Sequence, residues 1–334
     1  MSVLHRRRPL ARYLLASLVA VLVAAGCGGS SSSGGGGSSG KTYTVAMLHG
    51  LSNQFQTDIG KGAADVASKN GMTFQQLYFN LNAQRENEYV SDLITKKVDL
   101  IIYGANDPNV ALTNFKRIQA AHIPIVCFDT CVDPTLMPQY VKGFVTSDNP
   151  GLGSTIGQAA TSYIKSKLNG KATVAFVTCD SQQVCGSRHA AITTALQGVQ
   201  TQVVADQVAL TADQVKSTCE GILTAHPDLD MFINDGLAMT VGCTAAVANL
   251  KRKTVVFGMD ITTAIAQDVL APDNILQATV GQDGVKMGGL SMQMAVDSLH
   301  SKPVDPANVL IPGKLYSRDN PQEAQAYVKA HPSG

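Results

Sequence analysis

The sequence predicts an α/β fold with two lobes, each built on a doubly wound parallel β-sheet. From residue 41 onward, short β-branched segments alternate with longer amphipathic segments, the order typical of parallel sheets with right-handed crossovers. The segments 100–103 and 255–257 are entirely apolar or aromatic, as expected for strands covered on both faces. Nine expected strands over about 290 residues favour two domains of ordinary size. A single barrel of eight strand–helix units is the alternative.

The elements are expected in alternating order along the chain. Strands are short runs rich in β-branched residues, whereas helices carry apolar residues at intervals of three and four. Strands are expected at 43–48, 73–78, 100–103, 123–128, 172–177, 202–208, 231–233, 254–258 and 275–280, and helices at 55–70, 84–96, 109–121, 150–167 and 284–300.

The first 26 residues have the pattern of an export signal. Basic residues at Arg6 to Arg8 precede an apolar run over 14–25, which at about 12 residues is too short to span a bilayer. The run ends in Val23-Ala24-Ala25-Gly26-Cys27, which resembles the lipobox of bacterial lipoproteins. We therefore predict a lipoprotein signal peptide over 1–26 and lipidation at Cys27. An ordinary secretory signal followed by a chance cysteine is the alternative.

Residues 28–40 are only glycine and serine. Such a segment behaves as a flexible coil, and it has no side chain suited to catalysis. Residues 27–40 are therefore expected to be a lipidated cysteine and a tether. This arrangement predicts a folded body anchored by lipid at the extracytoplasmic face of the bacterial cell membrane.

Charge and aromatic content argue against nucleic acid as a partner. Of the 26 basic residues, four lie in the first 26 positions, so 22 remain against 25 acidic residues. The resulting net charge of −3 lacks the positive field that neutralises phosphates. Tryptophan is absent from the sequence and aromatic residues make up 5% of it, which argues against a base-stacking platform.

Motifs of the common enzyme classes are absent from the sequence. It has no phosphate loop, no Gly-x-Ser-x-Gly elbow and no His-Glu-x-x-His helix. Gly151, Gly153 and Gly157 loosely resemble a dinucleotide fingerprint, but they follow Asp148 without a clean strand-to-helix turn. We interpret them as the small face of a helix. The sequence predicts a binding protein with no catalytic activity, no metal and no cofactor.

Cysteine usage supports export. Apart from Cys27 there are six cysteines, an even number that is consistent with disulfides outside the cytosol. The Cys-x₃-Cys and Cys-x₅-Cys spacings do not match a tight zinc pattern, and a nucleophilic pair of Cys185 with His189 is a further alternative. Cys219 and Cys243 are expected on helices separated by one strand, which pack side by side. We predict the pairs Cys127–Cys131, Cys179–Cys185 and Cys219–Cys243.

Polar side chains recur where the expected strands end. In open parallel sheets, ligands bind at the carboxyl ends of the strands. One such residue commonly caps the next helix, but a recurring set indicates a site shared between lobes. The set is Asn53 at the start of the first helix, followed by Asp107, Asp129, Asp180, Asp235, Asp260 and Gln282.

Five segments, in matching order between residues 42 and 315, resemble the type 1 periplasmic sugar-binding proteins of the ribose and galactose group. They are 49–55 (HGLSNQF), 123–129 (IPIVCFD), 224–228 (TAHPD), 258–260 (GMD) and 278–282 (ATVGQ). The resemblance implies two Rossmann-like lobes joined by three crossovers near 146–148, 282–283 and 313–315, with ligand held between the lobes. The implied lobes are 41–146 plus 283–313, and 147–282 plus 314–334.

The resemblance also implies a set of ligand-binding residues. Phe55 matches a stacking aromatic, Asp129 a carboxylate that accepts hydrogen bonds from sugar hydroxyls, and Arg188 the arginine of the second lobe. The chemistry is suitable, because vicinal hydroxyls match carboxylates and an arginine fork, and the apolar face of a sugar matches an aromatic ring. The implied set is Asn53, Phe55, Asp129, Arg188, Asp235, Asp260 and Gln282.

Three positions depart from the ribose-binding pattern. Gln56 replaces a second aromatic residue, Thr130 replaces an arginine, and Asp235 or Gly236 stands where an asparagine is expected. These departures indicate another monosaccharide, a polyol or a purine nucleoside fragment.

The resemblance implies a monomeric solute-binding lipoprotein that delivers a sugar-like ligand to an ABC permease. A ligand sensor that presents its closed form to a membrane receptor is the alternative. A transcription regulator on the same lobes would begin with a helix-turn-helix, where this sequence has a lipobox and a tether.

Overall fold

The computed structural model describes residues 41–180 and 183–332. The predicted signal peptide over 1–26, the lipidation site Cys27 and the tether over 27–40 lie outside the described residues. Within the described ranges, no helix combines the length and the apolar character needed to cross a bilayer.

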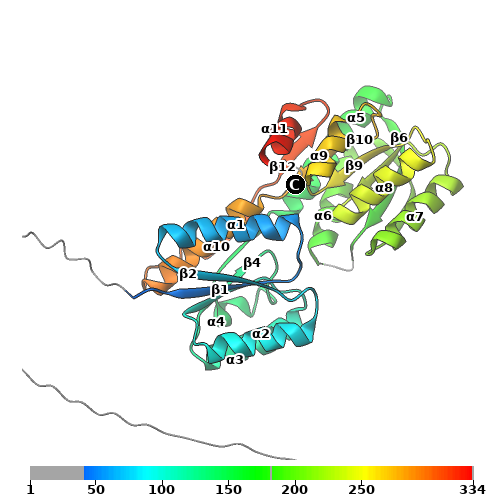
Figure 1. Ribbon diagram of the computed structural model, residues 1–334. Coiled ribbons are helices and arrows are strands. Elements are labelled where there is room, and N and C mark those ends of the chain that lie inside the picture. Colours follow the sequence, from blue (N-terminus) through cyan, green and yellow to red (C-terminus); the bar gives the residue numbers. More distant parts are fainter. Residues whose placement is uncertain (1–40, 181–182, 333–334) are drawn as a thin grey trace, which may run out of the picture. The chain divides into compact units, whose positions relative to one another are not determined.

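Two open six-stranded sheets form the framework (Figure 1). The first sheet has the order β11-β5-β4-β3-β1-β2, and all its strand pairs are parallel. The second has the order β12-β10-β9-β8-β6-β7 and is parallel except for β12. We call the layers around these sheets the N-terminal and C-terminal lobes. The prediction of two doubly wound sheets is confirmed, and the barrel alternative is wrong, because each sheet keeps two edge strands.

The nine expected strands agree with the observed strands to within two residues at each end. Three further strands, β5, β11 and β12, were not expected. The N-terminal sheet contains β1 (Thr44–His49), β2 (Thr73–Tyr78), β3 (Leu100–Tyr103), β4 (Ile125–Phe128), β5 (Val141–Ser147) and β11 (Asn308–Ile311). The C-terminal sheet contains β6 (Lys171–Thr178), β7 (Gln200–Val208), β8 (Met231–Asn234), β9 (Val255–Met259), β10 (Leu276–Gly281) and β12 (Lys314–Ser317).

Helices cover both faces of the N-terminal sheet. In β1, Val45 and Met47 pack with α1 (Gln54–Lys69) and α10 (Gly284–Leu299), which lie side by side in Figure 1. The alternate residues Ala46 and Leu48 belong to the opposite core. The helices on that side are α2 (Ala83–Thr95), α3 (Pro108–Ala120) and the short α4 (Met137–Tyr140). Because successive strand residues point to opposite faces, both faces of β1 are buried.

The C-terminal sheet is covered in the same way. Val174 and Phe176 of β6 pack on one side, and Ala175 and Val177 pack on the other. The first side carries α5 (Asn149–Lys167), α6 (Gln183–Ala195) and the short η1 (Leu196–Gly198). The second side carries α7 (Ala212–Ala225), α8 (Leu237–Asn249), α9 (Thr263–Leu270) and α11 (Gln322–Ala330).

Three chain connections link the two sheets. The first leaves β5 at Ser147 and enters α5, whose apolar face packs in the C-terminal lobe. The second leaves β10 and enters α10, which packs on α1 of the N-terminal lobe. The third joins β11 to β12. The residues between the linked elements are 148, 282–283 and 312–313.

The glycines of α5 allow a close helix contact. A Cβ atom on Gly153 would lie 2.1 Å from the carbonyl oxygen of Arg188, and one on Gly157 would lie 2.7 Å from Cβ of Ala195. No real Cβ atom fits at such distances, so α6 packs directly against the backbone of α5. The interpretation of Gly153 and Gly157 as the small face of a helix therefore agrees with the structure. The expectation that no clean strand-to-helix turn precedes them is wrong, because β5 ends at Ser147 and α5 begins at Asn149.

Three disulfides join the predicted cysteine pairs. The S–S distances are 2.07 Å for Cys127–Cys131, 2.05 Å for Cys179–Cys185 and 2.07 Å for Cys219–Cys243. The third disulfide connects α7 to α8 within the buried core. The other two lie at the carboxyl ends of β4 and β6, where the candidate site begins.

Candidate functional site

Asp129 and Asp260 follow directly after β4 and β9, at the carboxyl ends of the two sheets. Both residues have a left-handed backbone conformation, with φ of 60° and 70°. Such a conformation is uncommon for residues other than glycine, asparagine or aspartate, and it ends each strand. An aspartate is therefore presented at the same point of each lobe.

The carboxylate of Asp129 is influenced by groups of both lobes. Gln56 Nε2 donates a hydrogen bond to its Oδ2 at 3.2 Å. Burial raises the pKa of Asp129 to about 6, and the negative charge of Asp260 acts in the same direction. The positive charge of Arg188 and the hydrogen bond from Gln56 oppose this rise. Three predicted site residues, Asp129, Arg188 and Asp260, thus lie close enough to interact electrostatically.

Arg188 is a buried cation held by α6, with 6% of its surface exposed. Its Nε donates to Asn149 Oδ1 at 2.8 Å, and its Nη1 donates to the backbone oxygen of Asp235 at 3.1 Å. Nη2 has no hydrogen-bond partner in the described part of the chain. Burying a guanidinium is costly unless it is paired. Protein groups accept from Nε and Nη1, and Nη2 is available to donate a hydrogen bond to a ligand.

Asp235, predicted as a direct ligand contact, lies buried next to Arg188. The residue has no exposed surface, and its Oδ1 accepts the backbone N–H of Cys179 at 3.0 Å. Burial and the neighbouring Asp180 raise the pKa of its carboxyl group. Its backbone oxygen holds Arg188, and its Oδ2 is buried without a hydrogen-bond partner among the described residues. The role of Asp235 as a direct ligand contact stays a prediction.

Asp260 is held by a hydrogen-bond chain that connects the two sheets. Gln282 Nε2 donates to Asp260 Oδ1 at 2.7 Å. Ser147 Oγ, at the end of β5, donates to Gln282 Oε1 at 2.7 Å. The chain therefore runs from the last residue of an N-terminal strand, through a crossover residue, to the carboxylate of the C-terminal lobe.

Asn53 and Phe55 lie at the start of α1. Asn53 is the helix N-cap, since its Oδ1 accepts the backbone N–H of Gln56 at 2.9 Å. Phe55 is partly buried against the N-terminal core, close to Gly284 at the start of α10. The cap uses Oδ1 of Asn53, while its side-chain nitrogen Nδ2 has no hydrogen-bond partner among the described residues.

The remaining strand-end residues have structural partners. Asp107 caps α3 by accepting the backbone N–H groups of Asn109 and Val110. Asp180 Oδ2 lies 2.6 Å from His189 Nδ1. Cys185 is bonded to Cys179, so in this structure it is not a thiol available to pair with His189.

Three residues next to the site were not predicted as members of it. Gln56 was noted only as a departure from the family pattern, although it contacts Asp129. Ser147 and Asn149 were missed, although they hold Gln282 and Arg188. Ser147 ends a strand that the sequence analysis did not identify, and Asn149 resembles an ordinary first-turn residue of α5.

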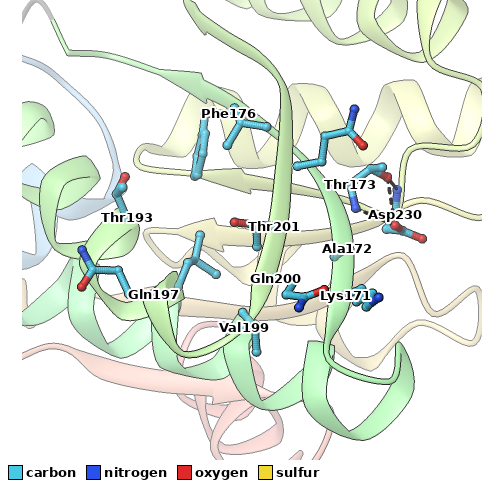
Figure 2. A pocket seen from close by; sticks show the side chains of 13 residues that line it. Lys171, Ala172, Thr173, Phe176, Thr193, Gln197, Val199, Gln200, Thr201 and Asp230 are labelled. Atoms are coloured by element: carbon cyan, nitrogen blue, oxygen red, sulfur yellow. Dashed lines mark hydrogen bonds between the residues drawn. The ribbon is translucent and has the colours of Figure 1, made fainter.

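A groove of about 690 Å³ lies elsewhere, along β6, η1 and β7 (Figure 2). Its lining includes Lys171, Gln197 and Thr201, and Asp230 at its side is hydrogen-bonded to Thr173 at 2.7 Å. None of the predicted site residues lines this groove. We therefore place the candidate site at Asp129, Arg188 and Asp260.

The whole arrangement can be compared with known proteins. A family model described as "Periplasmic binding protein domain" matches residues 45–303. The chain belongs to this family. The resemblance to type 1 periplasmic sugar-binding proteins is thereby confirmed at the level of the family.

Two curated relatives are similar over most of their length. The ABC transporter periplasmic-binding protein YphF of Escherichia coli (strain K12) is 25% identical over 300 residues, covering 88% of this chain and 91% of the relative. The ribose import binding protein RbsB of Bacillus subtilis (strain 168) is 27% identical over 276 residues, covering 79% of this chain and 84% of the relative.

A solved structure shows the same fold. An ABC transporter solute-binding protein of Bacillus halodurans C-125, with bound myo-inositol, superposes with a TM-score of 0.74 at 19% identity. The match covers 87% of this chain and 99% of that chain.

Proposed function

We propose that the protein is an extracytoplasmic solute-binding lipoprotein that captures a monosaccharide or a polyol between its lobes and delivers it to an ABC importer. The observation that supports this most is the electrostatic proximity of Asp129, Arg188 and Asp260, which come from different lobes. Carboxylates accept hydrogen bonds from hydroxyl groups, and a guanidinium donates them. A ligand with several hydroxyls satisfies groups of both lobes at once.

The chain connections support a hinge for this capture. Three segments join the lobes, and the Ser147–Gln282–Asp260 chain crosses between them. We infer that ligand binding favours a closed arrangement, because full hydrogen bonding needs groups of both lobes. A ligand shifts such an equilibrium only by its differential affinity for the two states.

The test is a thermal-shift screen of D-ribose, D-allose, D-arabinose, D-galactose, myo-inositol and glycerol, followed by calorimetry. We expect at least one of them to raise the melting temperature and to reduce the radius of gyration in solution scattering. Asp129→Ala and Arg188→Ala should each weaken binding of that compound by about 2–3 kcal/mol. Unchanged affinity in both variants would show that the site lies elsewhere.

A further inference from the structure

His49 is a buried histidine behind the candidate site. It ends β1, has no exposed surface and stacks on Tyr78, with ring centroids 4.5 Å apart. Its ring also meets the edge of Phe128, at 5.3 Å between centroids. Burial lowers the pKa of His49, so the ring is neutral at pH 7 and carries a single N–H group.

Gln56 connects this histidine to Asp129. The Oε1 of Gln56 lies 2.9 Å from His49 Nδ1, and its Nε2 lies 3.2 Å from Asp129 Oδ2. Only the amide nitrogen can donate to a carboxylate, so the amide carbonyl faces the histidine. That carbonyl requires a donor, which places the single proton of His49 on Nδ1. His49 has no exposed surface and Gln56 is 7% exposed, so the contact between these two side chains is shielded from water.

A second glutamine plays the same part in the other lobe. Gln282 donates to one oxygen of Asp260 and accepts from Ser147. Each aspartate thus has one oxygen held by a glutamine amide, and the other oxygen has no hydrogen-bond partner among the described residues.

We propose that Gln56, supported by His49, is a positioning residue that holds one oxygen of Asp129 and so leaves the other oxygen for the ligand. The inference rests on the proposed function, in which Asp129 binds the ligand. The charged groups that act on Asp129 are Asp260 and Arg188. The remaining oxygen accepts a hydrogen bond, which a hydroxyl group of a ligand can donate.

The first test follows the carboxyl group of Asp129 directly, by carbon NMR titration of the unliganded protein. Gln56→Met removes the donor at similar volume, and we expect the measured pKa of Asp129 to rise by about 0.5 to 1. Gln54→Met is the matched control, because Gln54 makes the same kind of bond to Asp58 on the exposed face of α1. An Asp129 pKa that is the same in wild type and Gln56→Met would overturn the proposal.

His49 is tested by a conservative rescue. In His49→Asn the amide nitrogen can take the place of Nδ1, whereas His49→Leu leaves the Gln56 carbonyl without a donor. We expect His49→Asn to keep the Asp129 titration near that of wild type, and His49→Leu to resemble Gln56→Met. If His49→Leu does not fold, His49→Asn still tests the proposal. An Asp129 pKa in His49→Asn equal to that in Gln56→Met would show that His49 does not support Gln56 through a hydrogen bond.

The effect on binding is tested by calorimetry with D-ribose, D-allose and myo-inositol. We expect Gln56→Met to weaken the compound that binds best about tenfold, or about 1.4 kcal/mol, and Gln54→Met to leave its affinity unchanged. Equal affinity of wild type and Gln56→Met would overturn the proposal. If no compound bound, the proposed function would fail, whereas the titration of Asp129 would still judge the role of Gln56.

Discussion

Asp129 and Asp260 occupy equivalent positions in the two lobes. The backbone N–H of Asp129 donates to Val145 on the neighbouring strand at 2.9 Å, and that of Asp260 donates to Val280 at 2.8 Å. The backbone oxygen of each aspartate accepts a threonine hydroxyl, from Thr146 at 2.7 Å and Thr279 at 2.6 Å. The same local design, with the same left-handed backbone, therefore presents one carboxylate from each lobe.

The raised pKa of Asp129 predicts how affinity depends on pH. If ligand hydroxyls donate to this carboxylate, binding requires its ionised form. Since its pKa in the folded protein is about 6, we expect affinity to be constant above pH 7 and to fall by up to about tenfold for each pH unit below 6. Calorimetry from pH 5 to pH 8 measures this. Asp129→Asn should bind weakly at every pH, and a wild-type affinity that does not change with pH would contradict the assignment.

The same pKa predicts an opposite trend for stability without ligand. A carboxyl group with a higher pKa in the folded state binds its proton more tightly there than in the unfolded chain. The contribution of Asp129 to the free energy of unfolding should therefore fall as the pH rises from about 4 to about 6. The pKa of Asp235 is also raised, so its contribution to stability falls over the same pH range. Comparing wild type with Asp129→Asn isolates the contribution of Asp129. We expect this variant to be about 1–3 kcal/mol more stable than wild type at pH 7, measured by urea unfolding.

The close packing of α5 and α6 predicts that Gly153 is needed for both stability and binding. Gly153→Ala would place a Cβ atom against the backbone oxygen of Arg188, so α6 must move and carry Arg188 with it. We expect a loss of about 1–3 kcal/mol in the free energy of unfolding, together with weaker binding.

Gly221→Ala is the matched control for Gly153. Gly221 lies within α7, and a Cβ atom there would meet no other atom within 4 Å. In an exposed helix interior, alanine is favoured over glycine by about 0.5–1 kcal/mol. Gly221→Ala should therefore be slightly more stable than wild type, with unchanged affinity. If Gly153→Ala and Gly221→Ala lost the same amount of stability, the contact between α5 and Arg188 would not explain the loss in Gly153→Ala.

The sequence predicted the two-lobed fold because strand and helix periodicity repeats regularly through the chain. It missed β5, whose run includes Lys142 and Gly143. Glycine weakens a strand pattern. A Cβ atom on Gly143 would lie 2.6 Å from the sulfur of Met294, so a larger residue there would displace the methionine side chain. Missing β5 also meant missing Ser147.

The sequence was less informative about the roles of individual site residues. A strand-end aspartate has the same local pattern whether it caps a helix, as Asp107 does, or faces the other lobe, as Asp129 does. Asp235 illustrates the same difficulty, since only the fold shows that it is fully buried beneath Arg188. Contacts such as that of Gln56 with Asp129 join residues 73 positions apart, and no local periodicity encodes them.

The N-terminal pattern predicts a lipid anchor. Radiolabelled palmitate should label the wild-type protein in a bacterial host that processes lipoproteins, and should not label Cys27→Ser. The matched control is Ser30→Ala in the same glycine and serine segment, which should be labelled like wild type. Labelling of Cys27→Ser, or no labelling of the wild type, would contradict the prediction.

The disulfides predict a separation between stability and affinity. Cys127 and Cys131 flank Asp129, so their bond closes a short loop around the site carboxylate. Cys219 and Cys243 are buried residues that join α7 to α8 at a sequence separation of 24, and a loop of that length is worth roughly 3 kcal/mol in the entropic model. Thiol titration of the denatured, unreduced protein should find none of these four cysteines free.

Two double variants test this separation. Replacing Cys127 and Cys131 by alanine frees the backbone of Asp129 to leave its left-handed conformation, so affinity should fall about tenfold, or about 1.4 kcal/mol. The loop closed by Cys127 and Cys131 is short, so its disulfide restricts the unfolded chain less than the Cys219–Cys243 disulfide does. The Cys127 and Cys131 variant should therefore lose less stability than the Cys219 and Cys243 variant. Replacing Cys219 and Cys243 by alanine should lower the melting temperature more and leave affinity unchanged, because neither cysteine contacts the site residues. Calorimetry and thermal unfolding of both variants decide the matter, and equal affinity in the two would show that the Cys127–Cys131 loop does not hold Asp129 in place.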